Sequence, residues 1–294
     1  MIKTHLPLQE CKDSLEKALD RLLTPPEGPY SYIFHAARYS LLTPGKRLRP
    51  LLVIATGETF GVSLEKTLNP ACALEMIHTY SLIHDDLPCM DDDDLRRGKP
   101  TLHTVYPEGQ AVLAGDLLLT LCFQTLASSP NLTAKQIVDM ISVLSKHAGG
   151  TGMIGGQSLD LFSEDKVISW ETLKAIHMGK TAALLSASLE IGGIAAGVCT
   201  SILKELCLIG QKIGLSFQII DDILDVEGDQ TTLGKPLGSD QENHKTTSIS
   251  LLGLDAAKKL SEELLQSVLE QCKNMQIEQS PLAQMLPKLV HRSF

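Results

Sequence analysis

The sequence has few aromatic residues, and its cysteines form none of the local patterns that mark disulfide-rich or zinc-binding chains. Aromatic side chains make up 4% of the 294 residues, whereas hydrophobic residues make up 43%. Strands are enriched in aromatic and β-branched residues, so this composition favours helix over sheet. The seven cysteines are scattered and odd in number, without a CxxC pair. This argues against a disulfide framework and a zinc site, and it fits a reducing cytoplasm.

Positive charge and long apolar runs are also scarce. The formal net charge is −9, which argues against a nucleic-acid partner because such binding depends on many lysines and arginines. The first ten residues contain no apolar core of a signal peptide, and no window has eighteen uninterrupted apolar residues. Secretion and a membrane span are therefore both disfavoured. Because no linker or compositional shift divides the chain, we expect one all-α domain over residues 1–294.

The apolar residues recur at helical spacing along most of the chain, and no segment alternates as a strand does. Proline and polar breaks separate these stretches. The pattern predicts helices over residues 7–23, 32–41, 50–60, 69–86, 108–128, 133–146, 153–161, 169–194, 200–226 and 254–272.

Two aspartate clusters stand at the ends of apolar stretches. The first lies in the run HDDLPCMDDDD, which starts at His84, and the second is DDILD, which starts at Asp221. Carboxylates at the mouth of an apolar element repel one another unless something positive joins them. Hard oxygen ligands suit Mg²⁺, which commonly bridges protein carboxylates to phosphate. The clusters therefore predict a magnesium-dependent enzyme that acts on a diphosphate.

The spacing in the second cluster fits a helix. Asp221 and Asp225 are four residues apart and share a helix face, and Gln218 lies one turn earlier on that face. Asp222 is turned away from it. This geometry predicts that Asp221 and Asp225 act together.

The spacing in the first cluster does not fit a helix face, since Asp85 and Asp91 are six residues apart. Pro88 should end the helix, because the residue before a proline avoids helical geometry. Asp91 can then curl back from the loop beside Asp85. For the acidic run 91–94 alone, a solvated loop remains an alternative.

Several cations lie near these motifs or between them. Each one alone reads as a solvated surface charge, but together they can hold two diphosphates, with arginine giving forked contacts. His78 shares a helix face with Asp85, which favours diphosphate binding over general-base work. The cations considered are Lys46, Arg49, Arg96, Arg97, Lys180, Lys235 and Lys245.

Five ordered motifs together carry a family resemblance. They are GKRLRP from Gly45, SLIHDDLPCMDDDDLRRGKPT from Ser81, GGQSLDL from Gly155, HMGKTAALL from His177 and FQIIDDILDVEGD from Phe217. In this order they resemble the trans-isoprenyl diphosphate synthases. The resemblance implies the isoprenoid synthase fold, a helical bundle around a deep central cavity, in a homodimer. It also implies head-to-tail condensation of isopentenyl diphosphate with dimethylallyl and then geranyl diphosphate, giving farnesyl diphosphate and pyrophosphate.

The resemblance further assigns roles to individual residues. Three magnesium ions would be bound or supported by Asp85, Asp86, Asp91, Asp221, Asp222 and Asp225. The allylic diphosphate would be contacted by Arg96, Lys180, Lys235 and Lys245, although the run Asn243-His244-Lys245 departs from the family pattern and leaves the role of Lys245 open. The isopentenyl diphosphate would be contacted by Gly45, Lys46, Arg49, His78 and Arg97. The allylic cation would be faced by Thr181 and Gln218.

Product length depends on the helix that carries Asp85. Tyr80, with Ser81 beside it, lies five residues before Asp85, about 7 Å along the axis, and its ring could form the floor of the pocket. A plain core role for Tyr80 and a C10 or C20 product remain alternatives.

A terpene cyclase is disfavoured, because aspartates at 225 and 229 replace the Ser/Thr and Glu of its second motif. A regulatory subunit is disfavoured because both acidic motifs are complete.

Overall fold

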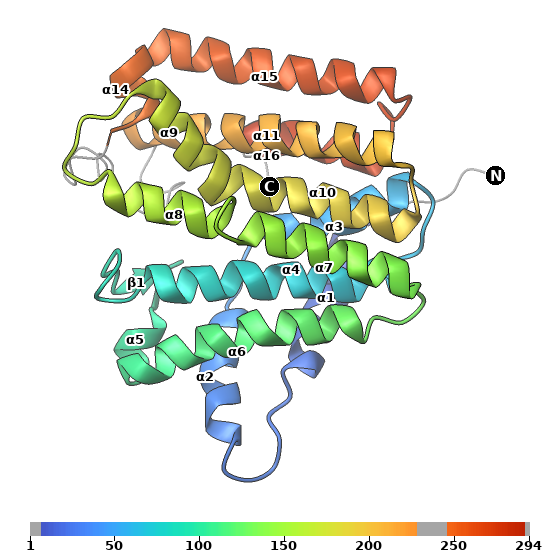
Figure 1. Ribbon diagram of the computed structural model, residues 1–294, viewed down its shortest axis with the longest axis vertical. Coiled ribbons are helices and arrows are strands. Elements are labelled where there is room, and N and C mark those ends of the chain that lie inside the picture. Colours follow the sequence, from blue (N-terminus) through green and yellow to red (C-terminus); the bar gives the residue numbers. More distant parts are fainter. Residues whose placement is uncertain (1–6, 228–245, 292–294) are drawn as a thin grey trace. The chain divides into compact units, whose positions relative to one another are not determined.

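The computed structural model describes residues 7–227 and 246–291, and these residues are almost entirely helical (Figure 1). The expected all-α fold is therefore confirmed. The chain divides into two compact units. The first comprises Met1–Ser142 and Ile191–Gly197, and the second comprises Val143–Glu190 and Val198–Phe294. The division falls inside two helices, α7 (Ala134–Ala148) and α10 (Ala183–Ala196).

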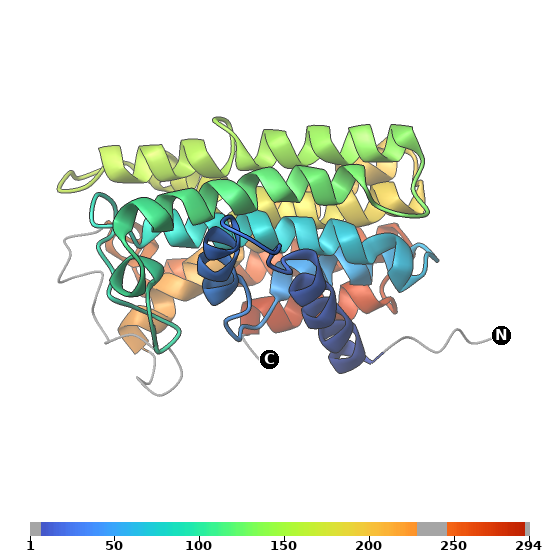
Figure 2. The same ribbon diagram turned by 90° about the horizontal axis from the view of Figure 1, so that it is seen from below.

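The first unit is built around a long buried helix. Its helices, besides parts of α7 and α10, are α1 (Leu8–Leu22), α2 (Ser31–Leu41), α3 (Leu48–Thr59), α4 (Leu64–Asp85), α5 (Leu102–Val105) and α6 (Glu108–Ala127). Every residue of α4 from Pro70 to Ile77 is buried, including Glu75, as expected of a central helix that is apolar on most sides. The helices α3 and α6 pack along α4 (Figures 1 and 2). This packing fixes the helix end that carries the first aspartate motif.

A short hairpin follows that motif, where the sequence shows only a polar break. Strands β1 (Leu95–Arg96) and β2 (Lys99–Pro100) pair antiparallel, with Arg96 opposite Lys99. The turn between them consists of Arg97, with φ of 54°, and Gly98, with φ of 74°. A two-residue turn with positive φ at both positions matches the twist of the strands it joins. The hairpin thereby holds Arg96 and Arg97 directly after the aspartates.

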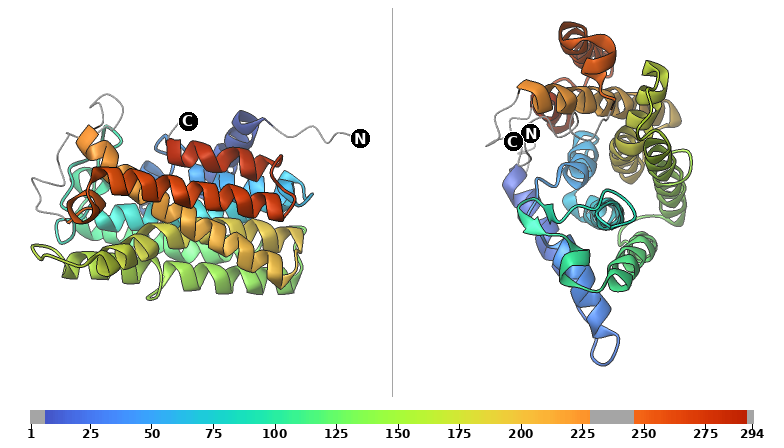
Figure 3. Two further views of the ribbon diagram at one scale, coloured as in Figure 1. Left: turned by 90° about the horizontal axis from the view of Figure 1, so that it is seen from above. Right: turned by 90° about the vertical axis from the view of Figure 1, so that its left-hand side faces the viewer.

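The second unit is built around α11. Its elements, besides parts of α7 and α10, are α8 (Met153–Phe162), α9 (Trp170–His177), η1 (Met178–Ala182), α11 (Thr200–Glu227), α14 (Ser248–Leu252), α15 (Leu254–Asn274) and α16 (Pro281–His291). Leu215, Ile219 and Ile223 recur every four residues along α11 and form a core cluster with Ala257 of α15. The helices α15 and α16 both pack against α11 (Figure 3).

The helix that runs from α9 to α10 contains a π-helical turn, η1. It lies close to α8 because glycines face it: a Cβ added to Gly156 would lie 2.2 Å from the backbone nitrogen of Lys180. The glycine-rich run 149–156 superficially resembles a phosphate loop, but we expect close helix packing there, and the packing of Gly156 confirms this. Single π-turns frequently mark functional sites, and η1 contains Lys180 and Thr181.

The predicted helices match the observed ones within a few residues, with three additions. The sequence reading missed α5 and α14, which have only four and five residues, and also α16, which contains Pro287. The predicted helix over 169–194 is interrupted by η1. One helix among the described residues, α6, is long and apolar enough to cross a membrane, judged by length and composition only. The core helix of a soluble protein passes the same test.

Candidate active site

The first aspartate motif folds back on the end of α4. The helix ends at Asp85, three residues before Pro88. The N–H of Asp91 donates to the carbonyl of Asp85 at 2.9 Å, and the carbonyl of Leu87 accepts from Met90 at 2.8 Å. The prediction that Asp91 curls back beside Asp85 is therefore confirmed for the backbone.

Asp86, at the C-cap of α4, is paired with an arginine of the hairpin. Arg96 Nε donates to Asp86 Oδ1 at 2.5 Å, and a second guanidinium nitrogen lies 3.3 Å from Asp93 Oδ2. Burial raises the pKa of Asp86 to about 6, and Arg96 opposes this rise. Asp86 thus orients Arg96, a contact that the sequence did not reveal. The predicted role of Asp86 as a metal ligand stays a prediction.

A basic cluster of the first unit contains four of the five residues predicted for isopentenyl diphosphate. Arg49 Nη1 lies 3.3 Å from Nε2 of His78, and burial together with Arg49 lowers the pKa of His78 well below its usual value. The guanidinium of Arg97 lies against Gly45, where an added Cβ would be 2.2 Å from Arg97 Nη1. The fifth residue, Lys46, is exposed.

Arg47 lies inside the same motif but has a different role. It is 3% exposed, and its guanidinium donates to Glu16 and to Glu75, at 2.8 Å and 2.5 Å. It also donates to the carbonyl of Leu41 at 2.7 Å. A buried charge with this many partners is structural, so Arg47 fixes the loop that carries Lys46 and the start of α3, which carries Arg49.

One pocket of the first unit collects residues from both sides of the first motif. Its charged lining residues are Asp86, Arg96, Arg97 and Lys99. Its other polar lining residues are Tyr39, Ser40, Thr43, Thr79 and Thr101. The sequence reading did not single out Lys99 or Thr79, although Lys99 lies in the motif RRGKPT and Thr79 follows His78 directly. Three cations around one pocket suit a ligand of high negative charge.

Tyr80 lies inside α4 and is 5% exposed. Its ring meets that of His84 edge to face at a centroid distance of 5.7 Å. Its hydroxyl is buried without a hydrogen-bond partner, and burial raises its pKa to about 12, with Cys122 and Asp85 contributing. Ser81 Oγ donates to the carbonyl of His78 at 2.9 Å. Tyr80 is therefore a buried ring close to the first aspartate motif. This position is compatible both with a pocket floor and with a plain core role.

The second motif forms a chain of hydrogen bonds in the second unit. Thr181 Oγ1 of η1 donates to Gln218 Oε1 of α11, and Gln218 Nε2 donates to Asp221 Oδ2 at 3.4 Å. The structure thus brings together three residues that the sequence analysis assigned to the allylic substrate and its metal. Asp225 is partly exposed and lies one turn beyond Asp221 on α11.

Asp222 bonds to partners other than those of Asp221, in agreement with the prediction that it is turned away from the helix face shared by Asp221 and Asp225. Its Oδ2 accepts from both the N–H and the hydroxyl of Ser248, each at 2.6 Å, and His177 Nε2 lies 3.8 Å away. These contacts join α11 to the start of α14. Ser248 and His177 were not singled out from the sequence, since only the fold brings them near Asp222.

The predicted lysines differ in what the structure shows of them. Lys180 Nζ donates to Asp160 Oδ2 at 2.7 Å. Asp160 is the aspartate of the GGQSLDL motif on α8, so this contact joins the two motifs in the fold. Lys235 and Lys245 lie outside the described residues.

A helical chain that combines two aspartate motifs with grouped lysines and arginines has the features of a protein that binds diphosphates. The chain belongs to the polyprenyl synthetase family, whose sequence model matches residues 31–285. It is 43% identical over 292 residues to "Farnesyl diphosphate synthase" of Escherichia coli, covering 97% of this chain and 98% of that protein. It is 47% identical to "Geranylgeranyl pyrophosphate synthase, chloroplastic" of Capsicum annuum, covering 85% of this chain and 68% of that protein.

Solved structures agree with this assignment. A geranyltransferase from Helicobacter pylori, "complexed with magnesium and isoprenyl diphosphate", matches with a TM-score of 0.83 and 36% identity, over 99% of this chain and 98% of that one. The fold of this chain is therefore that of the isoprenoid synthases.

Proposed function

We propose that the protein is a prenyltransferase that makes farnesyl diphosphate. It joins isopentenyl diphosphate head to tail with dimethylallyl diphosphate and then with geranyl diphosphate, and it releases pyrophosphate at each addition. The observation that carries the proposal is the pocket of the first unit, where Arg96, Arg97 and Lys99 surround a position next to the first aspartate motif. Membership of the polyprenyl synthetase family supports the reaction type.

The basic cluster suits isopentenyl diphosphate. Arg49, Arg97 and His78 converge there, and two guanidinium groups can each make forked contacts to phosphate oxygens. His78 is uncharged when Arg49 donates to it, so it orients the arginine without adding a charge. Lys46 is exposed and free to reorient toward the same diphosphate.

The donor set of the acidic motifs fits magnesium. The motifs offer only carboxylate oxygens, which are hard ligands. We infer three ions: Asp85 and Asp91 would hold two of them, and Asp221, supported by Asp225, would hold the third. Asp86 and Asp222 are bonded to Arg96 and Ser248, so they would support the ions while also positioning these two partners. Bound Mg²⁺ would neutralise the charge that develops on the leaving diphosphate.

The protein's own residues would assist ionisation of the allylic C–O bond. Arg96 and Lys180 stabilise the negative charge of the departing diphosphate. The dipoles of Thr181 and Gln218, fixed by their mutual hydrogen bond, face the allylic cation, which survives where water is excluded. The isopentenyl double bond attacks this cation, and the proton lost afterwards passes to the pyrophosphate, because no side-chain base is assigned.

Product length is the point on which relatives of the chain differ, since they include synthases named for farnesyl and for geranylgeranyl diphosphate. We assign the C15 product on the basis of Tyr80. Its buried ring lies on α4, about 7 Å before Asp85 along the helix axis. A bulky, well-packed ring at this depth is expected to stop the growing chain.

We further propose a single-domain, cytoplasmic homodimer. Support for the homodimer comes from α6, a long apolar helix on which Val112 and Leu113 are 36% and 52% exposed. An apolar face of this kind gains stability when a partner covers it. Support for the cytoplasm comes from the cysteines, all seven of which are free. Sedimentation of wild type against Leu113→Glu would test the dimer, which the added charge should dissociate.

The activity is tested by product analysis. Purified protein is incubated with Mg²⁺, isopentenyl diphosphate and dimethylallyl diphosphate, and product length is measured by chromatography. We expect farnesyl diphosphate, and a loss of at least about a hundredfold in turnover for Asp85→Asn and Asp221→Asn. Asp116→Asn, at an exposed aspartate of α6, is the matched control and should retain activity. Absence of pyrophosphate release from wild type, or full activity of both motif variants, would overturn the proposal.

A further inference from the structure

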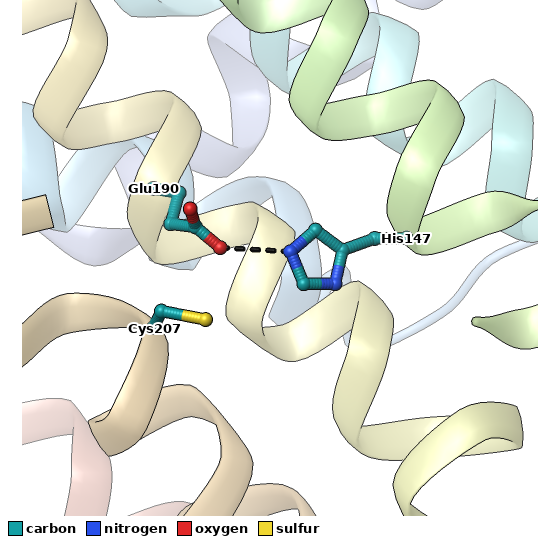
Figure 4. A group of neighbouring side chains, drawn as sticks. All are labelled: His147, Glu190 and Cys207. Atoms are coloured by element: carbon teal, nitrogen blue, oxygen red, sulfur yellow. Dashed lines mark hydrogen bonds and ion pairs between the residues drawn. The ribbon is translucent and has the colours of Figure 1, made fainter. Parts of the chain in front are cut away.

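Three potential metal ligands meet in the second unit, outside the residues assigned to prenyl transfer (Figure 4). His147 is at the end of α7, Glu190 is on α10 and Cys207 is on α11. Nε2 of His147 lies 2.8 Å from Oε1 of Glu190. One ligand atom from each residue can be chosen so that all three lie within 4.8 Å of one another. The side chains of His147 and Glu190 are only 10% and 16% exposed.

These separations are close to those of a tetrahedral metal site. Typical bond lengths from zinc to nitrogen, oxygen and sulfur put neighbouring ligand atoms roughly 3.3–3.6 Å apart. The pair formed by His147 and Glu190 would have to open by roughly half an ångström, and the widest separation, which is within 4.8 Å, would have to close by at most roughly 1 Å. Rotations of the side chains achieve shifts of this size without moving the helices.

The donors also define which ion would bind. Imidazole nitrogen and cysteine sulfur suit borderline and soft metals, whereas Mg²⁺ prefers oxygen ligands alone. We propose that His147, Glu190 and Cys207 form a site for a divalent transition metal, with Zn²⁺ the ion that this donor set fits best. The sequence argued against zinc because it lacks a local cysteine pair, but these ligands are up to 60 residues apart and are brought together only by the fold.

The proposed site is separate from the prenyl-transfer residues. Cys207 precedes Asp221 by 14 residues on α11, which corresponds to about 21 Å along a helix axis. An ion at Cys207 would therefore have a structural role: it would link the helices α7, α10 and α11 and take no part in the reaction. Three protein ligands leave a fourth position for water.

The surroundings of Cys207 indicate how an ion would enter. Burial, followed by the charge of Glu190, raises the pKa of the Cys207 thiol to about 12, and Lys146 opposes this rise. A metal ion must therefore displace the thiol proton, as metal ions do when they bind cysteine. Gln211 Nε2 lies 3.8 Å from the sulfur and can orient the thiolate that results.

Cobalt titration tests the site directly. The protein is stripped with a chelator and titrated with Co²⁺, a spectroscopic substitute for Zn²⁺, in excess Mg²⁺ so that the aspartate motifs are occupied. We expect one Co²⁺ per chain with the charge-transfer absorption of a cobalt–thiolate bond. Cys207→Ser should lose this absorption, and His147→Gln should bind at least about tenfold more weakly. Cys199→Ser, at an exposed cysteine outside the cluster, is the matched control and should retain both.

Alkylation of the wild-type protein provides a second measurement that does not depend on how the variants fold. Zn²⁺ should slow modification of Cys207 at least about tenfold, while the rate at Cys199, read from the same digest by mass spectrometry, stays unchanged. The proposal is overturned if wild type shows no cobalt–thiolate absorption, if Cys207→Ser keeps it, or if Zn²⁺ leaves the rate at Cys207 unchanged. The cluster would then be only a hydrogen-bonded pair beside a thiol.

Discussion

The protonation state of His78 makes the pH dependence of stability a test of the basic cluster. Arg49 donates to Nε2 of His78 across 3.3 Å, and this nitrogen can accept only while it carries no proton. Burial lowers the pKa of His78 well below 6.5, and the charges of Arg49, Arg97, Arg96 and Arg47 lower it further. His78 should therefore remain neutral in the folded protein at pH values where it is charged in the unfolded chain.

The size of the effect follows from proton linkage. Because the pKa is lowered on folding, the contribution to stability is complete above pH 6.5 and is lost as the pH falls from there toward the pKa of the folded state. Each pH unit in that window costs about 1.4 kcal/mol. Between about pH 7.5 and about pH 5, wild type should lose unfolding free energy because of His78 alone, by at most about 2 kcal/mol over this window.

The assay is urea unfolding of wild type and His78→Gln at both pH values. Other groups titrate in both proteins, so the difference between the two isolates His78. Wild type should lose more unfolding free energy than His78→Gln on acidification, by up to about 2 kcal/mol. His35→Gln, at an exposed histidine, should follow wild type. If wild type and His78→Gln lose the same amount, His78 is not held neutral by Arg49 and the proposed geometry of the cluster is wrong.

Three further predictions concern single contacts. Tyr80→Ala should lengthen the product, and a C15 product from an active Tyr80→Ala enzyme would contradict the pocket-floor role. Tyr80→Phe should keep the C15 product and raise the unfolding free energy by about 1 kcal/mol, because the hydroxyl is buried without a partner. Gly45→Ala would place a Cβ 2.2 Å from Arg97 Nη1 and should raise KM for isopentenyl diphosphate about tenfold. An equal increase in KM for the allylic diphosphate would count against assigning this cluster to isopentenyl diphosphate. Ser248→Ala removes the 2.6 Å hydrogen bond to Asp222 and should cost about 1.5–3 kcal/mol in urea unfolding, whereas a negligible loss would show that the backbone bond suffices.

The helical fold and the backbone of the first motif could be predicted because both depend on local rules. Apolar spacing gave most helices within a few residues, and Pro88 predicted where α4 ends. The six-residue spacing of Asp85 and Asp91 then required a returning loop, which the hydrogen bond between their backbones confirms. The grouping of Gly45, Arg49, His78 and Arg97 followed from the family resemblance.

What the sequence could not supply were partners distant along the chain. Arg96 bonds to Asp86, Lys180 to Asp160, and Asp222 to Ser248, and no spacing rule links these pairs. The turn η1 was missed for another reason: a single π-turn changes the hydrogen-bond pattern but hardly changes the apolar period. The helix α16 was missed because Pro287 inside it breaks the usual helical signal.

The turn η1 also sets the angular phase between the helices on either side. A deletion of one residue there would rotate everything on one side by about 100°. His177 lies just before this turn, and Glu190 lies eight residues after it, so the contacts of His177 with Asp222 and of Glu190 with His147 could not both survive. A change in the length of this segment should therefore be more damaging than a substitution at a position of η1 whose side chain makes no contact of its own.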